Sequence, residues 1–223
     1  MSEITRIDPE VLTDESTPAS VAQRMSWAAG RKTTRVEDRA YSLMGIFGVN
    51  LPPLYGEGPR AFIRLQEEIM RQSFDHSLFA WQPRITGYGL LAESPDQFFD
   101  SGNIVRISYD RYVLLLKITL ENPDYAQTNF GTRIHIPLER ANDPSVYRAY
   151  LACTRGKDTK DEQGQRKSLV YIYLLKKSEV GLNTYRRHSY GSLEQEPSSL
   201  TPANIQAETI YIPHSREVGS SKG

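Results

Sequence analysis

Residues 58–71 read Gly-Pro-Arg-Ala-Phe-Ile-Arg-Leu-Gln-Glu-Glu-Ile-Met-Arg and predict a helix. The apolar side chains recur at three- and four-residue spacing, which places them on one helical face: Phe62, Leu65 and Ile69. The opening glycine and proline suit a helix start. Opposite charges stand four residues apart in the pairs Arg64/Glu68 and Glu67/Arg71, which would support the helix.

Two shorter helices are expected before this one. Thr17-Pro18 supplies an N-cap and a first-turn proline, and apolar residues then recur up to Gly30: Val21, Met25 and Ala28. Thr34-Arg35-Val36-Glu37 has the form of a capping box, in which side chain and backbone donate reciprocally. Behind it runs an apolar face that Gly48 would end: Val36, Ala40, Leu43, Met44 and Phe47.

The composition changes near residue 100. Ten of the 13 tyrosines follow that point, whereas all four methionines and both tryptophans precede it. The first part carries 10 basic and 14 acidic residues, and the second carries 17 and 13. No internal repeat is found, which argues against a solenoid or a propeller.

After residue 100 the apolar period becomes two, as in strands with one buried face. The first such run is expected to be a strand with five residues on one face: Tyr112, Leu114, Leu116, Ile118 and Leu120. Residues 134–138 and 147–153 alternate in the same way, and the proline in the former predicts an edge or a strand end. Residues 169–175 are almost all apolar and predict a central strand, after a polar loop at 154–168.

These patterns predict an α+β fold. Residues 1–100 would form a helical unit of about three helices, and residues 101–214 an antiparallel, sandwich-like β domain with four or more strands. Residues 215–223 have no apolar period and are expected to be a disordered tail. Three short helices can bury only part of their apolar faces, so we expect an exposed apolar patch and possible self-association.

The overall composition excludes several classes of protein. The formal net charge is zero, so the usual basic footprint of a nucleic-acid binder is missing. The longest strictly apolar run, Val113 to Leu116, is far too short to span a bilayer. A single cysteine rules out an internal disulfide framework. We therefore expect a cytoplasmic protein that binds neither nucleic acid nor membranes.

Few residues have the spacing of a catalytic or metal site. The four histidines, His76, His135, His188 and His214, are scattered, so we expect no metal and no other cofactor. Cys153 lies on the apolar face of an expected strand, where burial raises a thiol pKa, so core packing is favoured over nucleophilic chemistry.

The segment 55–59, Tyr-Gly-Glu-Gly-Pro, resembles a phosphate loop only in part. It lacks the third glycine of a dinucleotide fingerprint and the Lys-Ser/Thr of a P-loop. Two glycines allow a sharp turn, and Glu57 would face the positive end of the next helix. A structural hinge is the favoured interpretation.

Other conspicuous side chains have a structural and a functional interpretation. Asp38 and Arg39 would pair across a helix interface or belong to a solvated charged face. Trp27 and Trp81 would anchor a partner or fill the core.

Several motifs in sequence order resemble the fungal heterokaryon-incompatibility (HET) family. They comprise residues 20–29, 31, 33–35, 37–41, 43–47, 55–58, 61–62, 64–69 and 79–81. Residues 89–92 and 101–103 resemble the link that follows, and the similarity is less specific at 128–129, 131, 134, 136–138, 150–153 and 185–187. The residues of these motifs that are candidates for interaction are Trp27, Arg35, Glu37, Asp38, Arg39, Tyr41, Tyr55, Gly56, Glu57, Gly58, Phe62, Arg64, Gln66 and Trp81.

In that family the HET effector domain lies upstream and carries three blocks: Leu-Ser-Tyr-x-Trp-Gly, a Trp-Ile-Asp block ending in Cys-Ile-Asp-Gln, and Arg-x-Trp-x-x-Gln-Glu. None of them occurs in this sequence. The resemblance therefore implies a region that normally follows the HET domain, and it assigns no effector residue to any position here.

Three functional hypotheses remain open. The first is a non-enzymatic module that contacts or regulates a HET-type effector domain, in cis or in trans, through the helices of residues 34–72. The second is an enzyme acting on a nucleotide such as NAD, because the HET domain has been likened to TIR domains, some of which cleave that cofactor. Its candidate carboxylates are Glu57 and Glu37. The third is a β domain that binds carbohydrate or peptide through its tyrosines, which exposed aromatic residues on one sheet face would favour.

Overall fold

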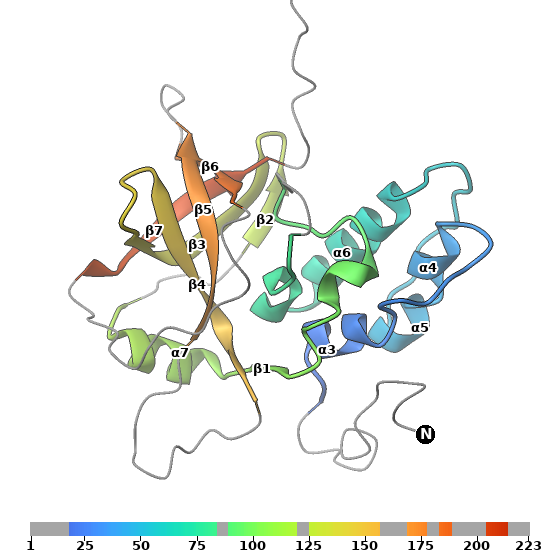
Figure 1. Cartoon of the computed structure of the whole chain (residues 1–223), viewed down its shortest axis with the longest axis horizontal. Coiled ribbons are helices and arrows are strands. Elements are labelled where there is room, and N and C mark those ends of the chain that lie inside the picture. The colour runs from blue at the N-terminus through green and yellow to red at the C-terminus, as the bar shows by residue number, and fades with distance from the viewer. Residues whose placement is uncertain are drawn as a thin grey trace, which may run out of the picture.

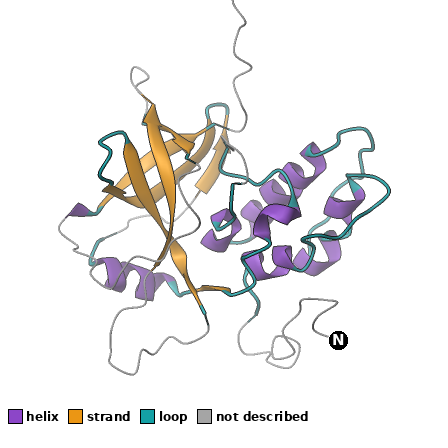
Figure 2. Cartoon of the chain, in the orientation of Figure 1, coloured by secondary structure: helices purple, strands orange, loops and turns teal. Residues whose placement is uncertain are grey.

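The computed structural model describes residues 18–83, 89–119, 125–156, 169–177, 183–188 and 204–213. It confirms an α+β fold, with most helices gathered beside a twisted sheet and one helix apart from them, below the sheet (Figures 1 and 2). The helices are α3 (Val21–Ser26), α4 (Asp38–Tyr41), α5 (Met44–Phe47), α6 (Arg60–Gln72) and α7 (Tyr109–Leu116), with 3₁₀ turns η1 (His76–Phe79) and η2 (Pro95–Phe98). No helix among these residues has the length and apolar character needed to cross a bilayer.

Helix α3 begins later than the sequence predicted. Its N-cap is Ser20, which forms a capping box with Gln23, and Thr17 lies outside the described residues. The predicted apolar face is confirmed, because Val21, Met25 and Ala28 are all buried.

The single helix expected after Thr34 is wrong, because the segment forms two short helices, α4 and α5. Glu37 is the N-cap of α4 but makes no side-chain cap, and its carboxylate turns instead to the backbone of a distant loop. The expected capping box therefore does not form, and Val36 is 56% exposed instead of lying on a buried face. Gly48 ends α5 in the left-handed conformation, as predicted.

Helix α6 confirms the strongest helical pattern of the sequence. It begins after Pro59 and buries Phe62, Leu65 and Ile69. Neither expected i,i+4 ion pair forms: Arg71 pairs with Glu68 one turn earlier, and Arg64 with a residue of the preceding loop. Exposed pairs on a helix contribute only a few tenths of a kcal/mol, so tertiary partners outcompete them easily.

The sheet contains seven strands in the order β1-β4-β5-β6-β7-β3-β2. Their bounds are β1 (Ile104–Arg106), β2 (Tyr125–Thr128), β3 (Gly131–Arg140), β4 (Val146–Arg155), β5 (Leu169–Lys177), β6 (Thr184–Arg187) and β7 (Gln206–Ile212). Because β3 also pairs with β4, strands β3 to β7 close into a five-stranded barrel, with β1 and β2 attached at its margins.

The barrel differs in two ways from the β domain that the sequence predicted. A sandwich is not confirmed, because this sheet closes on itself. The expectation of an antiparallel sheet holds for every pair except β6–β7, which is parallel. Five is an odd number, so strand direction cannot alternate all the way round a closed ring, and at least one neighbouring pair must run parallel.

Strand β3 is not an edge strand, although it contains Pro137. It pairs with β7 along one side, and with β2 and then β4 along the other. Pairing with β2 ends at Ile134 and pairing with β4 begins at Leu138, so the proline lies where the ladder changes partners. A missing N–H is tolerated at such a gap. The predicted strands β4 and β5 are confirmed, and β5 lies between two neighbours.

The strand expected from Tyr112 is wrong, because this segment is helix α7. Ser108 caps it, and the side chains of Tyr112 and Leu116, one turn apart, are buried whereas Leu114 is 74% exposed. A run of four apolar residues satisfies periods of two and of 3.6 equally well, which explains the error. Leu120 lies outside the described residues, as do residues 157–168 of the expected loop and the expected tail; β4 continues through Arg155.

One core runs through the helices and into the barrel. A single cluster of buried residues joins Leu65 of α6, Trp81 and Phe98 to the inward-facing side chains of all five barrel strands. A second, smaller cluster lies between α7 and the opposite face of β4 and β5. Cys153 is fully buried and burial raises the pKa of its thiol, as predicted for a core residue.

The segment 75–81 joins the helices to the barrel and is held from both sides. The carboxylate of Asp75 accepts hydrogen bonds from the backbone N–H groups of Val21 (2.9 Å) and Ser77 (2.9 Å). The guanidinium of Arg187, on β6, donates to the backbone oxygens of Phe79 (2.7 Å) and Trp81, and lies 3.8 Å from the centre of the Trp81 ring. Burial lowers the pKa of Arg187 to about 9.

His76 fills an irregularity in β4. The register of β4 against β5 shifts between Tyr150 and Thr154, and the N–H of Ala152, within that interval, donates to His76 Nδ1 at 3.2 Å. The ring is 2% exposed, lies among aromatic side chains, and has no partner for Nε2 within the described residues. Burial lowers its pKa to about 4.

His76 makes stability depend on pH. The pKa of His76 is about 4 in the folded chain and about 6.5 when unfolded. Between these two pH values the ring binds a proton in the unfolded state but not in the folded state. The stabilisation is complete above the unfolded pKa and is lost as the pH falls toward 4. We expect a loss of about 2 kcal/mol in unfolding free energy between about pH 7 and pH 5 from this residue, measured by urea denaturation.

The His76→Asn variant keeps an acceptor for Ala152 without the titration. Its unfolding free energy should fall less between the two pH values, by the amount that His76 contributes in the wild type. Equal pH slopes for the two proteins would contradict this prediction.

Gly131, at the start of β3, lies so close to the end of β7 that no side chain fits between them. Its φ is 121°, and an added Cβ would lie 2.2 Å from the carbonyl oxygen of Ile212. We expect Gly131→Ala to destabilise the fold by about 3 kcal/mol or more, because both its backbone and its neighbour must shift. Gly45, in α5, has open space around it and ordinary dihedral angles. Gly45→Ala should therefore be neutral or stabilising in the same thermal unfolding experiment.

Candidate functional site at the Tyr-Gly-Glu-Gly loop

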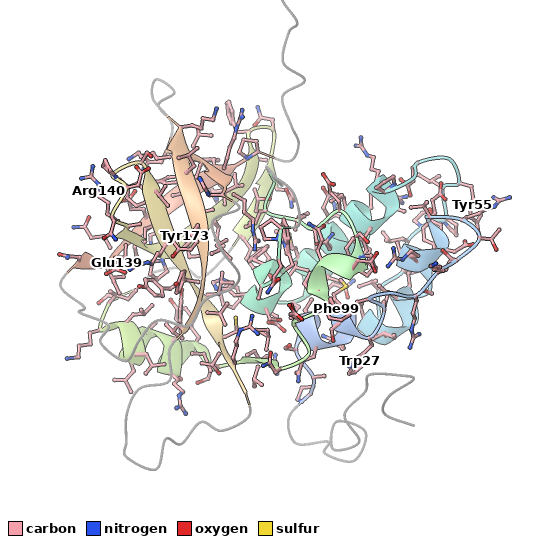
Figure 3. The ribbon with its side chains drawn as sticks, in the orientation of Figure 1. Trp27, Tyr55, Phe99, Glu139, Arg140 and Tyr173 are labelled. Atoms are coloured by element: carbon pink, nitrogen blue, oxygen red, sulfur yellow. The ribbon has the colours of Figure 1, made fainter. Side chains whose placement is uncertain are left out.

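Most of the candidate residues from the sequence meet where α4 and α6 enclose the loop at residues 54–58. The residues brought together are Arg35, Glu37, Asp38, Tyr41, Tyr55, Gly56, Glu57, Gly58 and Arg64. We call the side chains of Glu37, Tyr41, Glu57 and Arg64, with the loop that they hold, the loop clamp. It lies at the end of the helical unit that is far from the barrel, where Figure 3 labels Tyr55.

Glu37 holds the loop through its backbone. Its Oε1 accepts hydrogen bonds from the N–H groups of Gly56 (2.7 Å) and Gly58 (3.0 Å). Both glycines have positive φ, 98° and 58°, so their role is conformational, whereas the space around them is open. The N–H of Glu37 itself, followed by those of Gly58 and Gly56, lowers the pKa of the Glu37 carboxyl.

Glu57 holds the other side of the clamp. Its Oε1 accepts from Arg64 Nη1 at 2.6 Å and lies 2.9 Å from the Tyr41 hydroxyl. That hydroxyl also accepts from the N–H of Leu54 at 2.7 Å, and Arg64 donates to the oxygen of Pro52 at 3.1 Å. Burial raises the pKa of Tyr41. The sequence placed Glu57 at a helix N-terminus, and the structure gives it a specific cation in addition.

Tyr55 lies on the outer surface of the clamp in a fixed orientation. Its hydroxyl donates to Asp38 at 3.2 Å, and the Arg35 guanidinium lies 4.5 Å from its ring centre. Its ring meets that of Tyr41 edge to face at 5.8 Å. Tyr55 is nevertheless 57% exposed, so an ordered aromatic side chain faces the solvent.

One oxygen of each glutamate is used to hold the loop. Oε1 of Glu37 accepts from two loop amides, and Oε1 of Glu57 accepts from Tyr41 and Arg64. Within the described part of the chain, no cluster of three or more His, Cys, Asp or Glu residues could hold a metal ion. The expected hinge is a loop locked by side chains.

Arg39 serves a different contact. Its guanidinium forms a bidentate pair with Asp96, at 2.6 and 3.0 Å, and so ties α4 to η2. Asp96 also accepts from the N–H of Gly30 at 2.7 Å. Hydrogen bonds from Arg39, more than any other cause, lower the pKa of Asp96 to about 2. Of the two interpretations of Arg39, the structure shows the pairing between elements and not the solvated charged face.

The remaining candidates belong to the core or its margin. Phe62 packs edge to face on Phe98, with ring centres 6.5 Å apart, and Gln66 exchanges two hydrogen bonds with the backbone of Ala92. Trp81 is buried under Arg187. Trp27, labelled in Figure 3, is half-buried. A role of any of these residues in binding stays a prediction.

Sequence reasoning missed the polar side chains that join distant segments: Asp75, His76, Asp96 and Arg187. A local signal exists for two of them. Asp75 precedes η1 and Asp96 lies inside the Ser94–Gln97 capping box of η2, both recognisable cap patterns. No local pattern distinguishes Arg187, whose partners lie more than 100 residues away.

The tyrosines do not form an exposed cluster within the described residues of the barrel. Four are buried, Tyr112, Tyr150, Tyr171 and Tyr185, and five are half-buried, Tyr109, Tyr125, Tyr147, Tyr173 and Tyr211. The condition that would favour carbohydrate or peptide binding through the sheet is therefore not met there.

Comparison with known proteins relates part of the chain to a fungal incompatibility protein. A domain family of unknown function (DUF8212) matches residues 60–88, which include α6 and η1. Over 51 residues the chain is 59% identical to the vegetative incompatibility protein HET-E-1 of Podospora anserina. That stretch is 22% of this chain and 4% of that protein, so the chain corresponds to a small fraction of the relative's length. No solved structure matches the chain.

Removal of the Glu37 carboxylate should release the loop. In Glu37→Ala the amides of Gly56 and Gly58 lose their acceptor, and we expect their hydrogen exchange to accelerate by about tenfold or more. Glu57→Gln removes the ion pair with Arg64 and leaves those two amides bound, so their exchange should change little. Exchange measured by NMR distinguishes the two variants. If both amides in Glu37→Ala exchanged as slowly as they do in the wild type, the assigned role of Glu37 would be contradicted.

Proposed function

We propose that this chain is a non-enzymatic accessory or regulatory region of a fungal heterokaryon-incompatibility protein, acting by protein contact in the nonself recognition that ends in cell death. The 59% identity to a vegetative incompatibility protein over 51 residues supports this proposal. Its partner would be a HET-type effector domain, in the same chain or in another, in the cytoplasm.

The observation that carries the proposal is the state of the two glutamates. An enzyme acting on a nucleotide would need Glu37 or Glu57 directed at a substrate, and Oε1 of each is instead directed at groups of the protein itself. What they produce instead is a fixed loop with Leu54 and Tyr55 on its surface, which are 52% and 57% exposed. Large apolar side chains presented in a fixed conformation are typical of surfaces that bind proteins.

Control of the effector would follow from occupancy of this surface. If the effector binds only the ordered loop, the apparent affinity is proportional to the fraction of chains in which the clamp is closed. Any change that opens the clamp in part of the chains therefore weakens binding. The clamp would then set how strongly the effector is held.

The experiment is capture of a HET-type effector domain on the immobilised chain. We expect capture by the wild type, a loss of about tenfold or more with Glu37→Ala, and no change with Glu67→Ala. Glu67 is a matched control on α6, because it has no hydrogen bond or ion pair among the described residues. Viability of fungal cells that express both partners should change with Glu37→Ala in parallel.

Two results would overturn the proposal. One is the absence of capture together with unchanged viability for wild type and Glu37→Ala. The other is turnover of NAD by the purified chain that disappears in Glu57→Gln, which would make this chain an enzyme.

A further inference from the structure

The loop that leads into α4 carries two basic residues ahead of a threonine. It reads Arg31-Lys32-Thr33-Thr34, so Thr34 follows one cation by three positions and the other by two. All four side chains are exposed, and Figure 1 shows α4 at the side of the helical unit that is far from the sheet. A hydroxyl at this distance behind two cations suits protein kinases that select basic substrates, because acidic side chains of such a kinase pair with the cations.

The sequence contains this pattern a second time, and the structure separates the two occurrences. The second reads Arg186-Arg187-His188-Ser189. Arg187 is buried and donates to two backbone oxygens of the segment 75–81, so in the folded chain it is not available to acidic side chains of another protein. Ser189 lies outside the described residues. The pattern that ends at Thr34 is therefore the one whose two cations are accessible.

Thr34 can be presented to another protein at little structural cost. Within the described part of the chain, its hydroxyl has no hydrogen bond, and no backbone hydrogen bond involves residues 32–34. The one contact of this stretch that must open is the bond from the Thr33 hydroxyl to the oxygen of Arg35. Segments with few internal hydrogen bonds open locally at low cost, and modified residues lie mostly in such loops.

A phosphate on Thr34 would lie beside the residue that contacts Tyr55. The Arg35 guanidinium is 4.5 Å from the centre of the Tyr55 ring and has no ion pair to a described residue. The phosphate offers this guanidinium charge-assisted hydrogen bonds, which are stronger than a cation–π contact on an exposed ring. Arg35 would therefore leave the Tyr55 ring for the phosphate.

The carboxylates that hold the loop lie close behind Thr34 in the sequence. Glu37 accepts from the amides of Gly56 and Gly58, and Asp38 accepts from the Tyr55 hydroxyl. Backbone hydrogen bonds, the first from its own N–H, lower the pKa of the Glu37 carboxyl, and the charge of Arg35 adds to this effect. A phosphate repels both carboxylates and removes the cation near them, so it loosens the contacts that fix Tyr55.

We propose that Thr34 is the phosphorylation site of a protein kinase that recognises basic residues, and that its phosphate frees Tyr55 by taking over Arg35. Thr34 Oγ1 forms a bond to the γ-phosphorus of ATP, the bond from that phosphorus to the bridging oxygen breaks, and ADP leaves. The hydroxyl proton passes to a carboxylate of the kinase. The site itself is independent of the effector, whereas its regulatory consequence rests on the proposed contact function.

The first experiment maps the phosphate by mass spectrometry. The full chain is incubated with magnesium ATP and the catalytic subunit of cyclic-AMP-dependent protein kinase, and it is also recovered from fungal cells that express it. We expect phosphate on Thr34 in both samples, and on Thr34 of the matched variant Thr33→Val.

Charge variants test how the site is recognised. Arg31→Gln with Lys32→Gln should slow the reaction with the purified kinase about tenfold or more. Arg106→Gln with Lys117→Gln removes the same charge from exposed positions of other elements and should have no effect. Equal rates for the two double variants overturn the proposal. The absence of phosphate on Thr34 in the chain recovered from fungal cells overturns it as well.

The ring of Tyr55 reports the structural consequence. We expect phosphorylation to shift the NMR signals of this ring in the wild type. In Arg35→Gln the cation is already missing, so the phosphate should change the same signals little. Unchanged Tyr55 signals in the phosphorylated wild type overturn the assigned role of Arg35. Circular dichroism and thermal unfolding show that each variant is folded.

Effector capture distinguishes this inference from the proposed function. The phosphorylated chain should hold a HET-type effector domain about fivefold more weakly or less, whereas kinase-treated Thr34→Val should hold it normally. If the effector is captured and Thr34 is not phosphorylated, only the inference about Thr34 fails. If Thr34 is phosphorylated and the Tyr55 signals shift but no effector is captured, the site stands and the proposed role with the effector fails.

Discussion

The guanidinium of Arg187 is the contact on which the relation between the helices and the barrel depends. It is buried, and it donates to the backbone oxygens of Phe79 and Trp81 while lying over the Trp81 ring. Those carbonyl groups belong to a segment enclosed on all sides, where an unpaired acceptor would cost about 1–3 kcal/mol. If the segment 75–81 left the barrel, these two carbonyl groups would lose the donor that β6 supplies. The hydrophobic core that the helices share with the barrel would also be exposed.

A second principle of this structure is that acidic side chains point inward to backbone N–H groups. Glu37 holds the 56–58 turn, Asp75 holds the starts of α3 and η1, and Asp96 holds the end of the segment after α3. Each replaces a hydrogen bond that regular secondary structure would have supplied, which is how short helices connected by long loops stay ordered.

The relationship to an incompatibility protein and the geometry of the clamp point in the same direction. The similarity extends over 51 residues, and the clamp joins residues between 37 and 64 of the chain. Glu37 accepts from the amides of the two loop glycines, and Arg64 donates to Glu57 between them, so the loop is held from both sides. These contacts fix the shape of the loop, and a fixed loop with an exposed aromatic side chain is suited to recognition.

The sequence by itself determined the elements whose signals are local. The period of α6, the left-handed stop at Gly48 and the apolar run of β5 depend on contacts within a few residues, and the predictions there were correct. The tertiary structure decided the remainder. The segment at 109–116 became a helix because Tyr112 and Leu116 pack on the outside of the barrel, and the sheet closed because β3 pairs with both β7 and β4. The Glu37 carboxylate accepts from two amides that lie 19 and 21 residues further along the chain, instead of forming the capping box that its local motif predicted. The physical reason is the same in each case: local patterns state which conformations a segment can adopt at little cost, and only the packed partners determine which of these buries its apolar atoms and satisfies its polar ones.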